Sequence, residues 1–249
     1  MGIILKSPQE IERMRKAGKI VAIVLQKLKE AVRPGIKTKE LDKIAYKEIT
    51  KRGAIPSFKN YRGYPASICT SVNEEVVHGI PGNRIIKEGD IISIDVGAKI
   101  DGFHGDAAIT LAVGNLDREA EEIIHVTQQS LFEGIAAVKA GTHLGDVSSK
   151  IQQFVEGKGF SVVREYVGHG IGRDLHEEPQ VPNFGTPGEG HVLQEGMVFA
   201  LEPMVNAGVW QTKVLDNNWT VVTADGKLSA HFEHTIALGN NGVEILTQV

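Results

Sequence analysis

Five residues of types that bind metal ions lie inside distinctive local sequences of this chain. The sequences are DVGAKIDGFHGD, GHGIG, ALEPM and HFEHT, and the candidate ligands in them are Asp95, Asp106, His169, Glu202 and Glu233. Four carboxylates and one imidazole suit a pair of divalent ions when two of the carboxylates bridge, because hard oxygen donors dominate and positions stay open for water. The set predicts a dinuclear metal centre of the kind that hydrolases use.

The two aspartates are predicted to meet across a β-hairpin. Asp101-Gly102 favours a two-residue turn, which would place Asp95 opposite Ala108. Asp106 would then lie on the same face as Asp95, diagonally across the two strands at roughly 7–8 Å. A pair of solvated strand aspartates is the alternative, but Asp95 interrupts the run IISIDV, where an apolar side chain would pack better.

The other three candidates stand alone in their segments. His169 lies between glycines, which would let the backbone approach a ligand without side chains that crowd a metal. A phosphate-binding loop is the alternative for this glycine-rich run, but the run lacks the Gly-Lys-Ser/Thr ending of such loops. Glu202 ends the apolar run 197–201 and Glu233 lies within the strand-like run 230–238, so each alone could be a surface acid. Together with the hairpin they complete a metal-binding set.

Helical and strand-like patterns occur in two rounds. Ser7, Pro8 and Glu10 predict a capped helix that ends near residue 33, and a second helix is expected from a cap at Thr38 to a stop at Gly53. Helices near 117–139 and 143–158 open the second round. Two helices followed by strands, twice, predict an α+β fold with antiparallel pairing. The strand-like segments are 66–72, 90–113, 161–167, 197–205, 219–224 and 229–238.

The two rounds also match each other in sequence. AVRPG at 31–35 and AVKAG at 137–141 are offset by 106 residues, and Gly53 falls on Gly159 at the same offset. Such matches can arise by chance between two amphipathic helices, but we interpret them as an internal repeat. We therefore expect one catalytic domain over 1–249, built from pseudo-repeats at about 7–113 and 117–239 that are related by a pseudo-twofold axis.

Composition narrows the classes of protein that need to be considered. A chain of 249 residues with 41% hydrophobic content can bury one sizeable core, and a net charge of −4 supplies no broad basic surface for nucleic acid. The first residues lack the pattern of a signal peptide, and no run of 18 apolar residues suggests a membrane span. Cys69 is the only cysteine, which fits a reducing compartment. We expect a soluble, cytoplasmic protein without sequence-specific nucleic-acid binding.

Five stretches together resemble the motifs of type I methionine aminopeptidases in their short bacterial form. They are SICTSVNEEVVHGIP, ISIDVGAKIDGFHGDAAIT, VGHGIGRDLHEEPQVPNF, ALEPMV and LSAHFEHTIAL, and the similarity runs nearly end to end. The resemblance implies the pseudo-symmetric pita-bread fold. It also implies that Asp95 chelates one metal ion, that Asp106 and Glu233 bridge both, and that His169 and Glu202 complete the shell of the other. The two ions could be cobalt, manganese, iron or zinc.

The activity that the resemblance implies is removal of the initiator methionine from nascent proteins whose second residue is small. Glu202 would serve as general base, His176 would donate a hydrogen bond to the developing oxyanion, and His78 would contact the peptide nitrogen next to the scissile bond. The substrate is a peptide or nascent N-terminus, with transient ribosome association possible, and the enzyme is expected to be a monomer. The implied methionine pocket consists of Phe58, Tyr61, Tyr64, Cys69, Leu175 and Trp219 together with His78 and His176.

Two pocket positions depart from the common bacterial pattern, which leaves the shape of the pocket open. Phe58 stands where a cysteine is frequent, and Leu175 stands where a phenylalanine is frequent. Among the histidines without an implied role, His231 shares a strand face with Glu233 and could contact the centre, whereas His234 should point away.

Two other functions are weighed against this one. An Xaa-Pro peptidase of the same fold carries a similar ligand set, but such enzymes usually have an additional N-terminal domain, and only about 90 residues precede the hairpin here. A binding protein that kept the fold and lost the chemistry is the second alternative. The presence of all five ligands and both site histidines argues against it.

Overall fold

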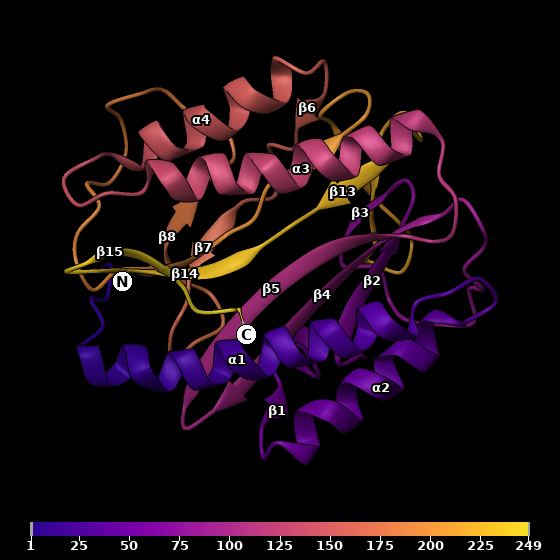
Figure 1. Cartoon of the computed structure of the whole chain (residues 1–249), viewed down its shortest axis with the longest axis horizontal. Coiled ribbons are helices and arrows are strands. Elements are labelled where there is room, and N and C mark those ends of the chain that lie inside the picture. Colours follow the sequence, from indigo (N-terminus) through magenta and orange to yellow (C-terminus); the bar gives the residue numbers. More distant parts are fainter. Residues whose placement is uncertain (1, 249) are drawn as a thin grey trace.

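Two pairs of helices enclose a set of antiparallel strands in the computed structural model, which describes residues 2–248 (Figure 1). Helices α1 (Pro8–Ala31) and α2 (Thr38–Lys51) lie along one outer side, and α3 (Arg118–Ala137) and α4 (Leu144–Glu156) lie along the other (Figure 1). The predicted α+β class is therefore confirmed. Within the described residues, no helix combines the length and the apolar character that crossing a membrane requires.

Most strands are short, β4 and β5 are the longest, and every pairing between strands is antiparallel. One sheet has the order β1-β4-β2 with β5 paired to β4, and the others have the orders β13-β10-β6, β11-β12-β3 and β15-β14-β9-β7-β8. A 3-10 helix, η1 (Tyr61–Gly63), precedes β2. The strands are β1 (Ile55–Pro56), β2 (Ile68–Val72), β3 (Glu75–Val77), β4 (Ile91–Ile100), β5 (Phe103–Ala112), β6 (Ser161–Val162), β7 (Gly168–Gly170), β8 (Glu177–Val181), β9 (Val198–Leu201), β10 (Met204–Asn206), β11 (Thr212–Val214), β12 (Val221–Thr223), β13 (Ser229–His231), β14 (His234–Gly239) and β15 (Gly242–Ile245).

The first helix begins at the predicted capping box. The backbone N–H of Glu10 donates to Ser7 Oγ at 3.3 Å, and the backbone N–H of Ser7 donates to the Glu10 carboxylate at 3.0 Å. The prediction for the second helix was wrong in one residue, because Lys37 rather than Thr38 occupies the cap position. The Thr38 hydroxyl is engaged elsewhere, since it accepts a hydrogen bond of 2.8 Å from the backbone N–H of Gly82.

The hairpin that carries the two aspartates has the predicted register. Asp101 and Gly102 form its turn with φ of 52° and 82°, the left-handed conformation that a two-residue hairpin turn of this kind requires. Asp95 lies opposite Ala108, and Asp106 lies opposite Gly97. Because side chains alternate along each strand, this register directs both carboxyl groups to one face of the hairpin.

Three predicted strands are shorter than expected, and two of them are divided for a backbone reason. The segment 161–167 is extended only at β6. The segment 197–205 splits into β9 and β10 at Pro203, which has no N–H to donate to a sheet. The segment 229–238 splits into β13 and β14 because Glu233 pairs with another sheet, its N–H donating to the carbonyl of Ala108 at 2.9 Å.

This change of partner joins the two halves of the chain. The Thr235 hydroxyl donates to the backbone carbonyl of Asp106 at 2.7 Å and accepts from its N–H at 3.0 Å. The segment around Glu233 and Thr235 therefore runs alongside β5, although 129 residues separate Thr235 from Asp106. We call these contacts the central clasp, because they place an acid from each half next to the other.

Apolar packing follows the same division into halves. Leu28, Leu41 and Ile49 of the first helix pair bury against residues of the β2-β4-β5 sheet such as Ile94. The α3-α4 pair packs on the strands β9, β13 and β14 through a second cluster that includes Ile151 and Phe199. A third cluster, which includes Phe58, Tyr64 and Leu175, lies between the two.

The helix bounds have the spacing of the expected repeat. Ala31 ends α1 and Ala137 ends α3, whereas Thr38 begins α2 and Leu144 begins α4, so both pairs are 106 residues apart. The division into pseudo-repeats at about 7–113 and 117–239 within one domain stays a prediction.

Replacing Thr235 by valine tests the central clasp. Thr235→Val keeps the shape of a fully buried side chain but removes both hydrogen bonds to Asp106, so the free energy of unfolding should fall by about 1–3 kcal/mol. Urea unfolding followed by circular dichroism measures the change. The control is Thr142→Val in the turn before α4, where one exposed hydrogen bond is lost and the effect should stay within about 0.5 kcal/mol. Equal effects of the two substitutions would contradict the role of the clasp.

Candidate metal centre

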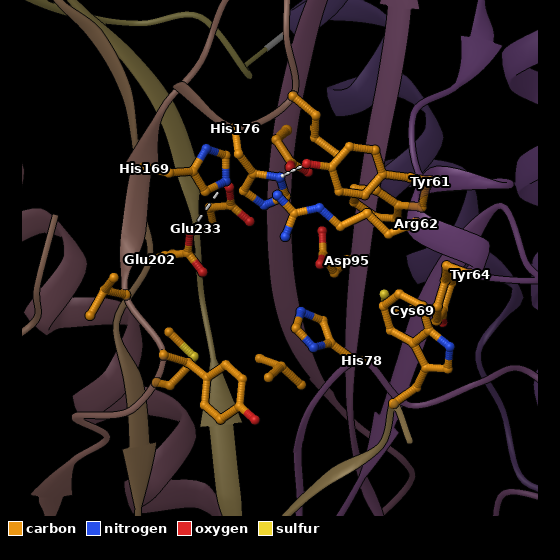
Figure 2. A pocket seen from close by; sticks show the side chains of 18 residues that line it. Tyr61, Arg62, Tyr64, Cys69, His78, Asp95, His169, His176, Glu202 and Glu233 are labelled. Carbon is orange, nitrogen blue, oxygen red and sulfur yellow. Dashed lines mark hydrogen bonds and ion pairs between the residues drawn. The ribbon is translucent and has the colours of Figure 1, made fainter. Parts of the chain in front are cut away.

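A cavity of about 230 Å³ opens where the third hydrophobic cluster meets the central clasp (Figure 2). All of the predicted site residues line it: Asp95, Asp106, His169, Glu202 and Glu233, together with His78, His176, Phe58, Tyr61, Tyr64, Cys69, Leu175 and Trp219. Segments that lie far apart in the sequence thus contribute to one concave surface.

Each candidate ligand comes from a different element. Asp95 and Asp106 project from β4 and β5, His169 from β7, Glu202 from the residue after β9, and Glu233 from the gap between β13 and β14. Oxygen and nitrogen atoms of Asp106, His169 and Glu233 lie within 4.8 Å of one another. Glu202 belongs to the same group, because its Oε1 lies 3.6 Å from His169 Nε2.

The buried carboxyl groups of this cavity fit cation binding. Asp95 Oδ1, Asp106 Oδ1 and Glu233 Oε1 are buried and accept no hydrogen bond from any residue between 2 and 248. Buried polar atoms normally have partners, so three orphaned carboxyl oxygens in one cavity need an explanation. Divalent cations would supply it, because carboxylates with one imidazole are a common donor set for such ions and these oxygens could coordinate them.

The raised pKa values of the acids also indicate a cation-binding site. Burial raises the pKa of Asp95 to about 7. Burial and the neighbouring carboxylates also raise the pKa of Asp106, Glu202 and Glu233 well above the usual range. Four carboxylates cannot be charged together in this space unless positive charge lies between them.

His169 is held in the form that binds a metal ion. Burial lowers its pKa to about 4, so the imidazole is neutral at physiological pH. Its Nδ1 donates to the carbonyl of Gly170 at 2.8 Å, which leaves the lone pair on Nε2. Nε2 is the nitrogen that faces Glu202, and this backbone hydrogen bond fixes its direction.

The glycines beside His169 pack tightly against the neighbouring strands. A Cβ on Gly168 would collide with the carbonyl oxygen of Ala200, and one on Gly170 would collide with that of Glu178. The glycines therefore let β8 and β9 approach β7 closely on both sides, and this close packing holds His169 in place. The prediction that they let the backbone approach a ligand stays a prediction.

Two further histidines face the cavity without belonging to the ligand group. His176 Nδ1 and the Tyr61 hydroxyl are joined by a hydrogen bond of 2.7 Å, and the rings of His176 and His169 lie 4.1 Å apart (Figure 2). Burial, together with the nearby His169, lowers the pKa of His176 to about 3. His78 adopts φ of 59°, an uncommon conformation for a residue with a side chain, and contacts the ring of Trp219 edge-on.

Of the two histidines that flank Glu233 in the sequence, only His231 approaches a candidate ligand. His234 Nδ1 bonds with the Thr247 hydroxyl at 2.9 Å, so its ring is engaged away from the carboxylates. His231 is almost fully buried, and its Nε2 lies 3.8 Å from Glu202 Oε2. It approaches Glu202 rather than Glu233, because the strand ends between His231 and Glu233.

The wall of the cavity next to the acids is aromatic and apolar. Tyr64 and Trp219 pack edge to face with ring centroids 5.1 Å apart. A Cβ on Gly97 would lie 2.7 Å from the Phe58 ring, so the glycine opposite Asp106 makes room for this phenylalanine. Cys69 is buried, and burial raises the pKa of its thiol. A thiol that stays protonated is a poor nucleophile, so Cys69 is a wall residue.

Five lining residues were not predicted: Arg62, Val77, Tyr166, Val167 and Met204. Val77 and Val167 directly precede His78 and Gly168, so adjacency to a motif could have suggested them. Arg62 directly follows the predicted pocket residue Tyr61, so the same adjacency could have suggested it. It adopts φ of 49° within η1, and this left-handed conformation is not evident from its residue type.

Comparisons with known proteins show which family has this sequence and this fold. Metallopeptidase family M24 matches the chain over residues 12–240. The chain belongs to this family. A methionine aminopeptidase of Clostridium perfringens (strain 13 / Type A) is 59% identical over 247 residues, 99% of this chain and 99% of that protein. The crystal structure of a methionine aminopeptidase from Thermotoga maritima matches with a TM-score of 0.98 and 49% identity, covering 100% of both chains.

The solved structure of a prolidase from Pyrococcus furiosus shares the fold more distantly. Its TM-score is 0.80 at 22% identity, and the match covers 99% of this chain but 66% of that one. The likeness shows a common fold and nothing about substrate. With the other comparisons it confirms the predicted pita-bread fold, and the predicted resemblance to the short bacterial form is likewise confirmed for this family M24 chain.

The affinity of this family M24 site for metal ions should rise with pH. Asp95, with a pKa of about 7, must lose a proton to bind a cation, whereas His169, with a pKa of about 4, is already neutral above pH 5. We expect the Kd for Mn²⁺ to decrease between pH 6 and pH 8. Isothermal titration calorimetry in buffers of different ionisation enthalpy should show proton release on binding. A Kd that is independent of pH, with no protons released, would contradict the raised pKa values.

Proposed function

We propose that this chain removes the N-terminal methionine from polypeptides whose second residue is small. The observation that carries the proposal is one cavity that brings together four acids and a histidine, all buried or largely buried, next to an aromatic and apolar wall. The 59% identical relative over the full chain bears the name methionine aminopeptidase, and membership of a metallopeptidase family agrees with the acids. The chain is a metal-dependent aminopeptidase.

We infer that the donor set would hold two divalent ions. Asp95 would chelate the first ion, His169 and Glu202 would complete the shell of the second, and Asp106 and Glu233 would contact both. Manganese, iron, cobalt and zinc all suit carboxylates with one imidazole, so availability decides among them. When bound, the ions would polarise a peptide carbonyl and lower the pKa of a water molecule toward neutrality.

The residues around the ligands supply proton transfer and orientation. Glu202 is suited to accept a proton from the attacking water, because its carboxylate lies in the cavity beside the other candidate ligands. When Tyr61 donates to His176 Nδ1, the neutral imidazole carries its proton on Nε2, where it can donate to the oxyanion. His78, neutral because burial lowers its pKa to about 4, would contact the peptide nitrogen.

The wall residues select an unbranched apolar side chain. Phe58, Tyr61, Tyr64, Cys69, Leu175 and Trp219 would surround it together with the two histidines. A cavity of about 230 Å³ has room for a side chain of the size of methionine, and its aromatic and apolar wall favours an uncharged one. Phe58 and Leu175 would set the depth of the pocket, since both are largely buried.

The substrate class suggests where the chain works. Initiator methionine is exposed on nascent chains, so we infer that the protein acts in the cytoplasm and contacts the ribosome transiently. All ligands come from one chain, and the site therefore needs no second copy, in keeping with a monomer.

A set of peptides separates this function from that of an Xaa-Pro peptidase. Met-Ala-Ser should be cleaved in the presence of Mn²⁺ or Co²⁺, and Met-Lys-Ser and Ala-Pro should remain intact, because only the first combines a thioether with a small neighbour. Chromatography of the products measures turnover. Cleavage of Ala-Pro in preference to Met-Ala-Ser would favour the prolidase-like alternative, and no turnover with any metal would favour a non-catalytic protein.

Two substitutions separate metal binding from catalysis. Asp106→Ala should abolish both metal content and turnover, because it removes the carboxylate proposed to contact both ions. His176→Ala should keep the metal and lower kcat by about 10²–10³, the usual effect of losing one oxyanion donor. Elemental analysis of the dialysed variants gives the metal content. Full activity of Asp106→Ala, or loss of metal from His176→Ala, would show that the roles are wrongly assigned.

A further inference from the structure

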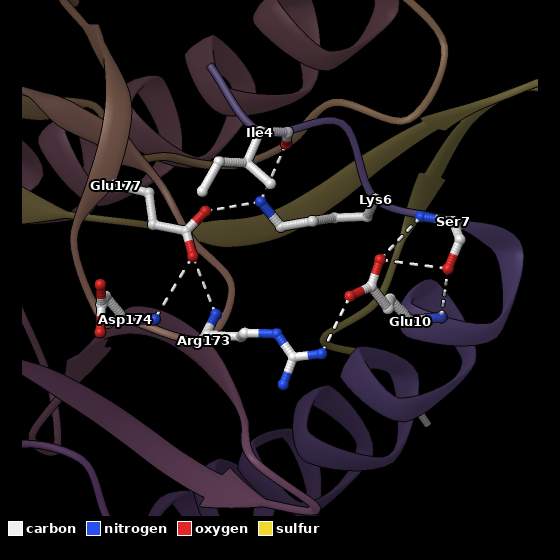
Figure 3. A network of polar contacts seen from close by, with 7 residues as sticks. All are labelled: Ile4, Lys6, Ser7, Glu10, Arg173, Asp174 and Glu177. Carbon is white, nitrogen blue, oxygen red and sulfur yellow. Dashed lines mark hydrogen bonds and ion pairs between the residues drawn. The ribbon is translucent and has the colours of Figure 1, made fainter. Parts of the chain in front are cut away.

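A buried ion pair joins the start of the chain to the loop that carries His176. Lys6 Nζ lies 2.5 Å from Glu177 Oε2, and only 3% and 6% of the two side chains are exposed (Figure 3). Lys6 Nζ also donates to the carbonyl of Ile4 at 2.9 Å. Its backbone N–H donates to the carbonyl of Gly196 at 2.7 Å, so the lysine is held at both ends.

The second oxygen of Glu177 holds the loop itself. Glu177 Oε1 accepts hydrogen bonds from the backbone N–H of Arg173 at 2.8 Å and of Asp174 at 3.3 Å (Figure 3). The Arg173 guanidinium in turn donates to Glu10 at 3.1 Å, in the capping box of α1. We call residues 171–177 the site loop.

The site loop delivers two residues to the cavity. Leu175 and His176 both line it, and they lie between the amides that Glu177 binds and Glu177 itself. Space around the pair is tight, because a Cβ on Gly172 would collide with both Glu177 and Lys6. The carboxylate of Glu177 therefore closes the loop into a compact turn, and Lys6 covers that carboxylate.

Charge explains why the lysine is needed. A carboxylate as buried as that of Glu177 is costly without a positive partner, and removal of one member of a buried pair is far more disruptive than replacement of both. Without Lys6, the carboxylate would turn toward water and release the amides of Arg173 and Asp174. The two residues between those amides and Glu177 would lose their fixed positions.

We propose that Lys6 is a positioning residue, which acts through Glu177 to hold His176 and Leu175 at the catalytic cavity. The proposal rests on the function proposed above, because it assigns His176 to the reaction. It gives the N-terminal segment, which contributes no candidate ligand, an indirect part in turnover.

The test compares Lys6→Met with Arg15→Met. Arg15, in α1, forms an ion pair with Glu244 at 2.6 Å, but this pair is far more exposed than that of Lys6 and does not include a residue of the site loop. We expect Lys6→Met to lower kcat for Met-Ala-Ser by about 10- to 100-fold at unchanged metal content, because a displacement of the order of 1 Å has effects of this size. Arg15→Met should leave kcat unchanged.

A double-mutant cycle shows whether the loss of activity in Lys6→Met depends on His176. In the His176→Ala background, Lys6→Met should have little further effect on kcat, since the residue that it positions is already gone. The double variant Lys6→Met/Glu177→Gln should recover most of the lost activity, because a neutral glutamine oxygen can still accept from the amides of Arg173 and Asp174. If Lys6→Met does not fold alone, refolding upon addition of Glu177→Gln supports the same account.

Hydrogen exchange supplies a readout that does not depend on activity. The amides of Arg173 and Asp174 should exchange faster in Lys6→Met than in Arg15→Met, and their protection should return in the double variant. Unchanged kcat and exchange in Lys6→Met, or a loss that adds in full to that of His176→Ala, would overturn the proposal. Absence of turnover in the unmodified enzyme would instead overturn the proposed function, and the exchange result would still stand.

Discussion

Repulsion among four buried carboxyl groups is the constraint on which the rest of this structure depends. Asp95, Asp106, Glu202 and Glu233 share one cavity, and three of them carry an oxygen without a hydrogen bond from any part of the chain between residues 2 and 248. Burial favours their neutral forms, whereas a hydrolytic metal centre needs them charged. In the function we propose, cations bound between these groups would reconcile the two, and the same ions that supply the chemistry would stabilise the folded chain.

Rigid elements must hold such a group together, and the fold provides them from both halves. The β4-β5 hairpin fixes two acids by local register, and the central clasp brings Glu233 beside them through Thr235. The helix pairs lie outside these strands and contribute no ligand, so their part is to bury the outer faces of the strands (Figure 1). The site loop is less regular, and in our proposal its position depends on the buried pair of Lys6 and Glu177.

Local signals explain which features could be predicted from the sequence. The capping box of α1 and the turn of the hairpin each depend on a few neighbouring residues, and both have the expected geometry. The end of β13 before Glu233 was missed because it results from pairing with Ala108, more than 120 residues away. The pair of Lys6 and Glu177 was missed for the same reason, since 171 residues separate them and neither belongs to a metal-binding pattern. His231 approaches Glu202 because of that strand break, which no periodicity in the sequence indicates.

Anomalous diffraction from crystals grown with Mn²⁺ tests the central claim most directly. We expect two manganese peaks in the cavity. Asp106 and Glu233 should contact both ions, Asp95 should bind one of them, and His169 and Glu202 should bind the other. Manganese bound only elsewhere on the protein, with hydrogen-bonded water between the four carboxyl groups, would contradict the central claim.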